Sequence, residues 1–515
     1  MLSSGKRNQS IFPKSFLFSI TLVLAMVIGM TGCQQQQHPA TLTEQPSDVN
    51  IRMALENKLE NAHGIPQATE ISVEVENGIV TYFGAIDNML AKERATRIAE
   101  SITGVRSVIN NLSVTSERPD QAIQTDVQDA LNEDPATEDL DVQVQVQNGQ
   151  VTLSGEVDSH QEQELAETVV KGVKGVVALH DSINVDFALD RSARDIKTDV
   201  LSALRWDTRI DPELINISVE DNVVSLSGTV GSAHEKTLAL QKSWVAGVKS
   251  VDAGELEVKS WKKGDIQQVG TQVEVTDSNV ESAIRAALEV APRVKAGSIG
   301  IEVVNGHVTL AGTVDNLKAS RSAAQVARNT RGVRSVSNAI KVGPVVDITD
   351  EKIMKETRSA IVRDPYLEQE DINVAVKDGI VELSGTAATY FEKWETGDIA
   401  AKVDGVLEIE NKIDVEYPKQ RYGQTFYDWD PVLHDFDYEP QQKSDQQLLE
   451  DVKYHLSWNP FIQAEDLEIS VSDGVVTIDG EVDSWYKANM TIGEAYEAGA
   501  TYVDSKLKFT DIPTF

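Results

Sequence analysis

The chain has 515 residues, 41% of them hydrophobic, which excludes global disorder and predicts several folded domains. Its 82 acidic residues outnumber its 47 basic residues, so the formal net charge is −35. Such a surface repels phosphate groups, which argues against nucleic-acid binding and against electrostatic attachment to anionic lipid. The single cysteine, Cys33, excludes a disulfide within the chain.

The N-terminus has the pattern of a secretion signal over residues 1–33. Three basic residues and no acid precede an apolar run that ends in Met-Thr-Gly-Cys33. This stretch resembles a bacterial lipoprotein signal, in which Cys33 carries the lipid and becomes the mature N-terminus. Gln34 in place of Asp implies, by the same resemblance, attachment to the outer membrane. The alternatives are an ordinary signal peptide with an incidental cysteine, or an uncleaved anchor.

After a Gln-, Thr- and Pro-rich segment, 34–48, which we expect to be a flexible tether, one unit of about seventy residues recurs six times. Each unit is predicted to contain a helix, two strands, a second helix and a third strand. The expected units span 49–116, 120–187, 192–260, 276–344, 349–418 and 444–513, with longer linkers at 261–275 and 419–443.

The first helix and the first strand of a unit are predicted from hydrophobic periodicity. Apolar residues four apart, from Ile51 to Leu59, place one stripe on a helical face. Apolar and polar residues then alternate from Ile71 to Val75, which is typical of a half-buried strand. Unit five interrupts the helical stripe with Thr357.

A tight turn is predicted to join the first two strands of each unit. Asn-Gly and Asp-Gly pairs favour a two-residue type I′ hairpin, because both central positions need positive φ. Unit three has Asp221-Asn222, which tolerates this geometry less well. The other five units carry Asn77-Gly78, Asn148-Gly149, Asn305-Gly306, Asp378-Gly379 and Asp473-Gly474.

Two further glycines recur in every unit, and we interpret both as structural. The first closes the second strand, where it allows a bulge or a close backbone contact. The second caps the second helix at a Gly-Val step, which is Gly-Ala in unit six. The strand glycines are Gly84, Gly155, Gly228, Gly312, Gly385 and Gly480; the step glycines are Gly104, Gly175, Gly247, Gly332, Gly405 and Gly499.

The expected fold is therefore α+β: a tandem array of six small α-β-β-α-β modules, each a three-stranded mixed sheet with two helices. The third strand follows a helix, so it can join the hairpin by a crossover while both helices cover one face of the sheet. A domain of seventy residues has a small core, so we expect neighbouring units to dock, above all across the short joints between units one to three.

The recurring pattern Asn-Gly-x-Val-Thr-Leu-Ser-Gly, followed by Gly-Val-x-x-Val, resembles the BON domain family over nearly all of the mature chain. The resemblance implies a periplasmic or outer-membrane protein. Members of this family bind phospholipid, act as stress-induced periplasmic chaperones, or serve as interaction modules in envelope machinery. The family offers no catalytic residues to carry over.

The residues themselves predict no enzyme, no cofactor and no metal site. The eight histidines show no ligand spacing, and we expect each at the surface or in a turn: His38, His63, His160, His180, His234, His307, His434 and His455. The lone cysteine is assigned to the lipid, which leaves no thiol for catalysis.

Aromatic residues are the candidate contacts with a partner. Trp429 lies in the acidic, aromatic linker 419–443, which could bind a partner, hold calcium weakly, or pack on units five and six. Trp485 and Tyr486 begin the second helix of unit six, where they could insert into a lipid surface or pack between units.

The functional hypothesis is a non-enzymatic envelope lipoprotein, located in the periplasm and anchored to the outer membrane by its N-terminal lipid. It would present BON modules to phospholipid or to envelope proteins and support envelope integrity or the stress response. The alternatives are a chaperone-like osmotic-stress protein and a structural spacer. The sequence leaves the oligomeric state open.

Overall fold

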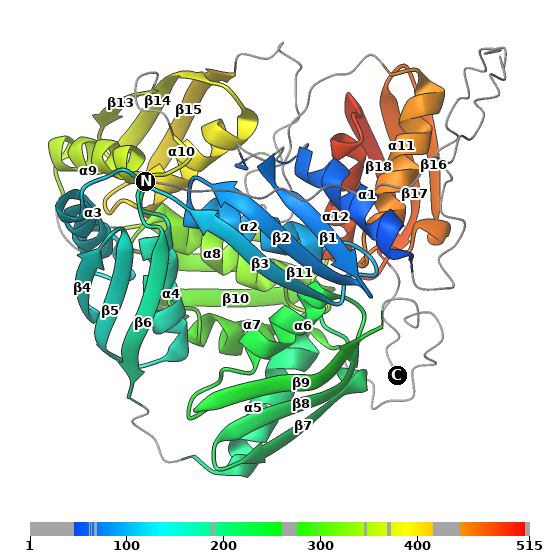
Figure 1. Ribbon diagram of the computed structural model, residues 1–515, viewed down its shortest axis with the longest axis horizontal. Helices are drawn as coiled ribbons and strands as arrows, with labels where there is room; N and C mark the ends of the chain where they lie inside the picture. The colour runs from blue at the N-terminus through cyan, green and yellow to red at the C-terminus, as the bar shows by residue number, and fades with distance from the viewer. Residues whose placement is uncertain are drawn as a thin grey trace, which may run out of the picture. The chain divides into compact units, whose positions relative to one another are not determined.

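Six copies of one helix-strand-strand-helix-strand module make up the described part of this computed structural model (Figure 1). The structure describes residues 46–509 except 61, 63, 66–69, 187–190, 260–274, 295, 344–347, 368–371 and 416–442. The predicted signal peptide, Cys33, most of both predicted linkers and Trp429 lie outside the described residues.

The first three modules share one order of elements. The first contains α1 (Asp48–Glu60), β1 (Ser72–Glu76), β2 (Ile79–Ile86), α2 (Met89–Glu100) and β3 (Ser107–Val114). The second contains α3 (Asp120–Glu133), β4 (Asp141–Gln147), β5 (Gln150–Val157), α4 (His160–Lys171) and β6 (Ala178–Val185). The third contains α5 (Ala193–Trp206), β7 (Ile215–Glu220), β8 (Val223–Val230), α6 (Ala233–Lys242) and β9 (Ser250–Val258).

The last three modules repeat this order. The fourth contains α7 (Asp277–Glu289), β10 (Ile299–Val304), β11 (His307–Val314), α8 (Leu317–Arg328) and β12 (Ser335–Val342). The fifth contains α9 (Asp350–Arg363), β13 (Ile372–Lys377), β14 (Ile380–Ala387), α10 (Tyr390–Lys402) and β15 (Glu408–Val415). The sixth contains α11 (Asp445–Trp458), β16 (Leu467–Ser472), β17 (Val475–Val482), α12 (Trp485–Glu497) and β18 (Tyr502–Phe509).

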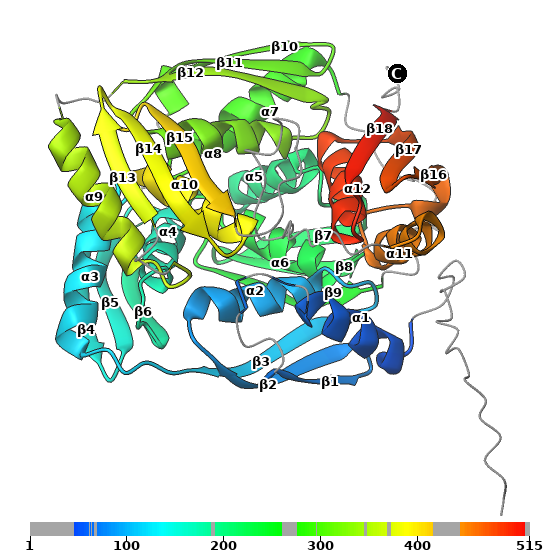
Figure 2. The ribbon, with the colours of Figure 1, turned by 90° about the horizontal axis from the view of Figure 1, so that it is seen from above.

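Every module forms a mixed three-stranded sheet, as the sequence predicts. The hairpin strands β1 and β2 pair antiparallel, and β3 returns to pair parallel with β2, giving the order β1-β2-β3. The other five sheets have the same order and directions. In Figure 2 the sheet of the first module carries α1 and α2 on the same side. The second strand is therefore central, and the face opposite the helices remains uncovered by the module's own elements.

Each hairpin turn has positive φ at both central residues, as a type I′ turn requires. Asn77 and Gly78 have φ of 52° and 73°, and the third module reaches the same geometry with Asp221 and Asn222 at 51° and 64°. A non-glycine residue at the second position carries a steric cost. In the third module the Asn222 side chain donates to the Gly247 carbonyl at 2.8 Å, which helps to offset that cost.

All twelve recurring glycines adopt positive φ, between 80° and 152°. Gly155 shows why a side chain is not accommodated at the end of the second strand. A Cβ placed there would lie 1.9 Å from the Asp141 carbonyl oxygen of the neighbouring strand. The glycine permits this close approach and bends the strand where it leaves the hairpin.

The core of each module lies between its sheet and its two helices. In the first module Ile51 and Leu55 of α1 pack with Val80 and Tyr82 of β2, all four of them fully buried. The Tyr82 hydroxyl donates to the Ala95 carbonyl at 3.0 Å, so its polar group is satisfied inside the core. In the fifth module Thr357 is also fully buried, so the interrupted stripe still faces the core.

The first helix of the sixth module begins with a capping box. Ser444 and Gln447 form it before α11, with both reciprocal hydrogen bonds present. Among the described residues, we find no helix that combines the length and the apolar character needed to cross a bilayer.

Candidate functional site

An aspartate at the first helical position ties the first helix to the hairpin turn in five modules. The Asp48 carboxylate accepts hydrogen bonds from the amides of Asn77 and Gly78, both at 2.8 Å. The same pair of bonds is made by Asp120, Asp277, Asp350 and Asp445. The third module has Ala193 at this position and is also the module without the turn glycine. The recurrence of this aspartate 28 to 29 residues before the turn was a readable signal that the sequence analysis missed.

The modules also contact one another through a backbone hydrogen bond that occurs three times. In each case the residue just before a step glycine donates its amide to the carbonyl of the last residue of a first helix. Thr103 donates to Trp458 at 2.9 Å, Lys174 to Arg363 at 2.7 Å, and Arg331 to Trp206 at 2.7 Å. These bonds join the first module to the sixth, the second to the fifth and the fourth to the third.

We name the contact between Thr103 and Trp458 the first–sixth interface and the contact between Arg331 and Trp206 the third–fourth interface. The expectation that sequence neighbours dock is therefore only part of the finding. Modules at opposite ends of the described chain also make direct contact, because the carbonyl that ends a first helix has no partner within its own helix. The amide of the residue just before the step glycine supplies the hydrogen-bond donor for that carbonyl.

The second helices carry a separate set of contacts. Lys171 of α4 forms an ion pair with Glu93 of α2 at 2.9 Å, and Thr237 of α6 donates to Glu100 of α2 at 2.9 Å. Lys318 of α8 forms an ion pair with Asp398 of α10 at 2.7 Å. Burial raises the pKa of Glu100 to about 7, although the Thr237 hydroxyl opposes this shift.

The candidate contact aromatics of α12 lie within this packing. Tyr486 is 5% exposed, and its ring meets the Phe461 ring edge to face at 5.7 Å. The Arg328 guanidinium of the fourth module lies 5.1 Å from the centre of the Trp485 ring. In this arrangement the Tyr486 ring is not presented at the surface, and Trp485 contacts another module.

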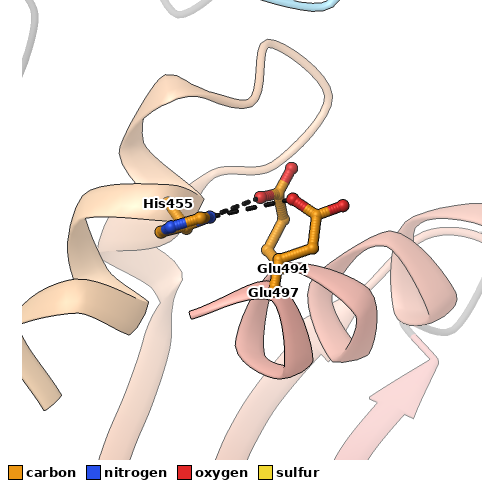
Figure 3. Close-up of side chains that lie close together, drawn as sticks. All are labelled: His455, Glu494 and Glu497. Atoms are coloured by element: carbon orange, nitrogen blue, oxygen red, sulfur yellow. Dashed lines mark ion pairs between the residues drawn. The ribbon is translucent and has the colours of Figure 1, made fainter. Parts of the chain in front are cut away.

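One group of three side chains has the spacing of a possible metal site. Figure 3 shows His455 on α11 facing Glu494 and Glu497 on α12. The His455 Nδ1 atom lies 3.4 Å from Glu494 and 3.8 Å from Glu497. It is the one such group of histidine and acidic side chains among the residues that the structure describes. The sequence analysis expected His455 at the surface or in a turn, whereas its side chain is only 14% exposed.

A cationic side chain from another module already forms ion pairs with these two carboxylates. The Lys58 ammonium of the first module lies 3.0 Å from Glu494 and 3.2 Å from Glu497. The Asn459 amide donates to Glu494 at 2.7 Å. A metal ion would have to displace Lys58, so the group acts as the ionic centre of the first–sixth interface.

The pKa shifts in this group agree with that role. Burial alone would raise the pKa of Glu494, but the Lys58 charge and the His455 contact hold it well below its usual range. Burial would lower the pKa of His455, yet its contacts with Glu494 and Glu497 raise it. Burial would likewise lower the pKa of Lys58, and the same two carboxylates raise it. All three groups are stabilised in their charged forms.

His234 corrects the sequence expectation in the same way. Its side chain is buried, with 7% exposed, and its ring meets Phe461 of the sixth module edge to face at 5.6 Å. His160 stacks on Trp244 of the third module with the ring centres 3.9 Å apart. Both histidines contact a ring from another module, which the local sequence does not indicate.

Comparisons with known proteins agree with the repeat. The model of the BON domain matches residues 47–116, 119–186, 192–260, 276–344, 349–417 and 444–510. The chain belongs to the BON domain family, with six copies of the domain.

Two relatives are similar to about two modules of this chain. Osmotically-inducible protein Y of Escherichia coli (strain K12) is 29% identical over 143 residues, which are 27% of this chain and 71% of the relative. Outer membrane lipoprotein DolP of Haemophilus influenzae (strain ATCC 51907 / DSM 11121 / KW20 / Rd) is 28% identical over 157 residues, or 29% of this chain and 81% of the relative.

Among solved structures, CdsD, a structural protein of the type III secretion system of Chlamydia trachomatis, matches with 13% identity and a TM-score of 0.12. That match covers 43% of this chain and 100% of the CdsD chain. The CdsD C-terminal domain matches with 18% identity and the same TM-score, over 44% of this chain and 100% of the CdsD chain. These scores are too low to relate the whole folds.

Proposed function

We propose that this chain is a non-enzymatic lipoprotein of the bacterial envelope, held in the periplasm at the outer membrane by a lipid on Cys33. Its six BON modules bind phospholipid or envelope proteins and support envelope integrity or the stress response. One relative is named an outer membrane lipoprotein, which supports the proposed location. The other is named an osmotically-inducible protein, which supports a link to stress.

The observation that carries the proposal is the way the modules use their surfaces. The ends of three first helices, the residues before three step glycines, and the Trp485 and Tyr486 rings are engaged in contacts between modules. The outer sheet faces are not covered by the helices of their own modules, so they are the surfaces available to a ligand. The contact between the first and sixth modules does not favour an extended spacer.

The chaperone-like alternative predicts broad, weak binding of unfolded polypeptide. The acidic composition would keep such complexes soluble. The exposed large apolar residues in the described part of the chain number ten, five of them in the first module, which is less than the broad apolar surface that binding of many unfolded clients would need. Suppression of the aggregation of unfolded proteins by the purified chain would favour the chaperone-like function.

The experiment that tests the proposal is the substitution Cys33→Ser in the secreting bacterium. The unaltered chain should fractionate with the outer membrane, and the variant should appear in the soluble periplasmic fraction. If the variant is secreted and folded but still fractionates entirely with the membrane, the proposed lipid anchor is wrong. Proximity labelling from the unaltered chain would then identify the envelope proteins that it contacts.

A further inference from the structure

The outer face of the first module's sheet carries an apolar patch. Ile79, Phe83 and Ile109 are 37%, 40% and 48% exposed. On β2, Ile79 and Phe83 alternate with Val80 and Tyr82, which are buried under the helices, so they lie on the opposite face of the sheet. Ile109 of β3 pairs with Thr81 and lies on that same face. We call these three residues the outer patch.

The register of the strands makes the outer patch continuous. Thr81 pairs with Ile109, which places Ile109 diagonally between Ile79 and Phe83. Neighbouring strands lie about 4.8 Å apart, so large side chains at diagonal positions on one face are within reach of one another. The patch is therefore one surface of three side chains.

The positions of Phe83 and Ile109 are polar or small in the other five modules, so the fold does not require apolar residues there, whereas the position of Ile79 is also apolar in three of them, as Val223, Ile380 and Val475. Position Phe83 corresponds to Ser154, Ser227, Ala311, Ser384 and Asp479, and position Ile109 to His180, Asp252, Ser337, Glu410 and Asp504. Five of the ten exposed large apolar residues in the described part of the chain belong to this one module. An exposed apolar cluster that the fold does not need is a candidate contact surface.

The chain enters the first module at the end of the sheet where Ile79 lies. The Asp48 carboxylate at the start of α1 binds the amides of Asn77 and Gly78, the two residues just before Ile79. Twelve residues separate Cys33 from Pro46, the first residue described. Even fully extended, that length of chain reaches at most about 45 Å. A lipid on Cys33 would therefore keep this module near the bilayer, where a weak second contact becomes effectively intramolecular.

Acidic side chains on the same face of the sheet oppose an electrostatic attraction to anionic lipid. Glu74 and Glu76 of β1 are exposed and pair with Thr81 and Ile79 of β2, so they border the outer patch. Together with the net charge of −35, they oppose anionic headgroups. An apolar contact, in contrast, does not depend on headgroup charge.

We propose that the outer patch of the first module is the surface that rests on the phospholipid bilayer carrying the N-terminal anchor. This inference rests on the proposed function and names the module and the face that meet the lipid. The contact is apolar, so it forms on zwitterionic vesicles. It is weaker on anionic vesicles at low salt and recovers as added salt screens the repulsion.

The first test uses the chain from Cys33 to Phe515, coupled through its single cysteine to maleimide lipid in phosphatidylcholine vesicles. Hydroxyl-radical oxidation of Phe83 should fall at least threefold relative to the uncoupled chain. Tyr502, which lies at the first position of β18 in the sixth module and is 49% exposed, is the internal control and should react equally in both. Equal oxidation of Phe83 with and without vesicles would overturn the inference.

The second test compares variants by flotation with phosphatidylcholine vesicles, using the uncoupled chain with Cys33→Ser. The pair Phe83→Ser and Ile109→Ser introduces residues found at these positions in sister modules, so folding should be retained. Removing two half-exposed apolar side chains should lower vesicle partitioning about tenfold or more. The matched pair Val290→Ser and Val304→Ser, at residues 57% and 53% exposed in the fourth module, should leave partitioning within about twofold of the parent chain.

The outcomes separate the inference from the proposed function. Equal flotation of the parent chain and the Phe83→Ser, Ile109→Ser variant would show that the outer patch does not contact the bilayer. Phospholipid binding by another surface would then still hold. No flotation of the parent chain, together with an unprotected Phe83 on coupled vesicles, would overturn both the patch and phospholipid as the ligand. Envelope proteins would then remain as the ligands of the proposed function.

Discussion

The first–sixth and third–fourth interfaces share one backbone hydrogen bond but support it with different side chains. In the first–sixth interface Glu494, 1% exposed, receives its counter-charge from Lys58 of another module. In the third–fourth interface Asp207, 2% exposed, receives it from Arg209 of its own module at 2.8 Å. The buried carboxylate is thus neutralised by a residue of another module in the first–sixth interface and by a residue of its own module in the third–fourth interface.

The difference shows which part of the contact the fold determines. The step glycine and the helix end place the backbone donor and acceptor wherever two modules meet in this way. The ionic groups around them differ, so they decide how strongly each interface depends on charge. Arg331 reinforces the third–fourth interface without a carboxylate, by donating to the carbonyls of Arg205 at 2.8 Å and Ile210 at 2.7 Å.

Glu494→Gln should give the largest effect. It leaves Lys58 and His455 without their main counter-charge, and breaking a buried ion pair costs about 3–5 kcal/mol. We expect the free energy of unfolding, measured in urea, to fall by about 3 kcal/mol, with faster hydrogen exchange at the Thr103 amide.

The matched control is Asp207→Asn, which removes a buried acid paired within its own module. It should destabilise the chain while leaving exchange at the Arg331 amide nearly unchanged. If both variants accelerate exchange at their interface amides equally, the contrast between the two interfaces is wrong.

Arg331→Ala should have the next largest effect. It removes three charge-assisted hydrogen bonds to main-chain carbonyls, two short ones to Arg205 and Ile210 and a longer one to Asp207 at 3.4 Å, and each unsatisfied buried acceptor costs about 1–3 kcal/mol. We expect a loss of about 2 kcal/mol in the free energy of unfolding, measured in urea. Arg331→Lys should recover less than half of the loss, because one ammonium does not replace the two-pronged guanidinium contact. Full recovery by lysine would mean that charge alone supports the contact.

Thr103→Val tests a smaller component of the first–sixth interface. The Thr103 hydroxyl donates to the Trp458 carbonyl at 2.7 Å, beside the backbone bond to the same oxygen. Valine keeps the shape and the backbone donor, so we expect a loss of about 1 kcal/mol by urea denaturation. An effect as large as that of Glu494→Gln would indicate that the hydroxyl stabilises the interface as much as the ion pair does, which contradicts the expected ranking of the two variants.

A change of pH should give the smallest and most selective effect. The raised pKa of His455 means that its stabilising contribution is complete below its unfolded pKa of about 6.5 and is lost as pH rises through the folded value. The lowered pKa of Glu494 means that its contribution is present above about 4.5 and is lost as pH falls. The first–sixth interface should therefore be most stable between these values.

Exchange at the Thr103 amide, corrected for its intrinsic pH dependence, should increase from pH 6 to pH 8, while the corrected rate at Arg331 should not. Asp207 also has a lowered pKa, because Arg209 and Lys242 outweigh the effect of burial, so its contribution persists throughout this range. His455→Gln should abolish the response at Thr103. An undiminished response in that variant would assign the pH dependence to another group.

Local chemistry made most of each module predictable. The hairpin follows from residue pairs such as Asn77-Gly78, and the core face of α1 follows from the spacing of Ile51 and Leu55. The contacts of His455 were not predictable, because Lys58 lies 397 residues earlier in the chain and carries no motif that pairs it with Glu494. A single sequence shows which residues are apolar or charged but not which distant surface they meet.

The sequence by itself determined the number of modules, the order of their elements and the family, since turn chemistry and hydrophobic periodicity act over windows of a few to about twenty residues. Only the tertiary structure decided that the first module meets the sixth, that Lys58 occupies the space beside His455, and that Phe83 and Ile109 form one exposed patch. These outcomes depend on strand register and on helix ends brought together across the whole chain, and that information is distributed over residues far apart in sequence.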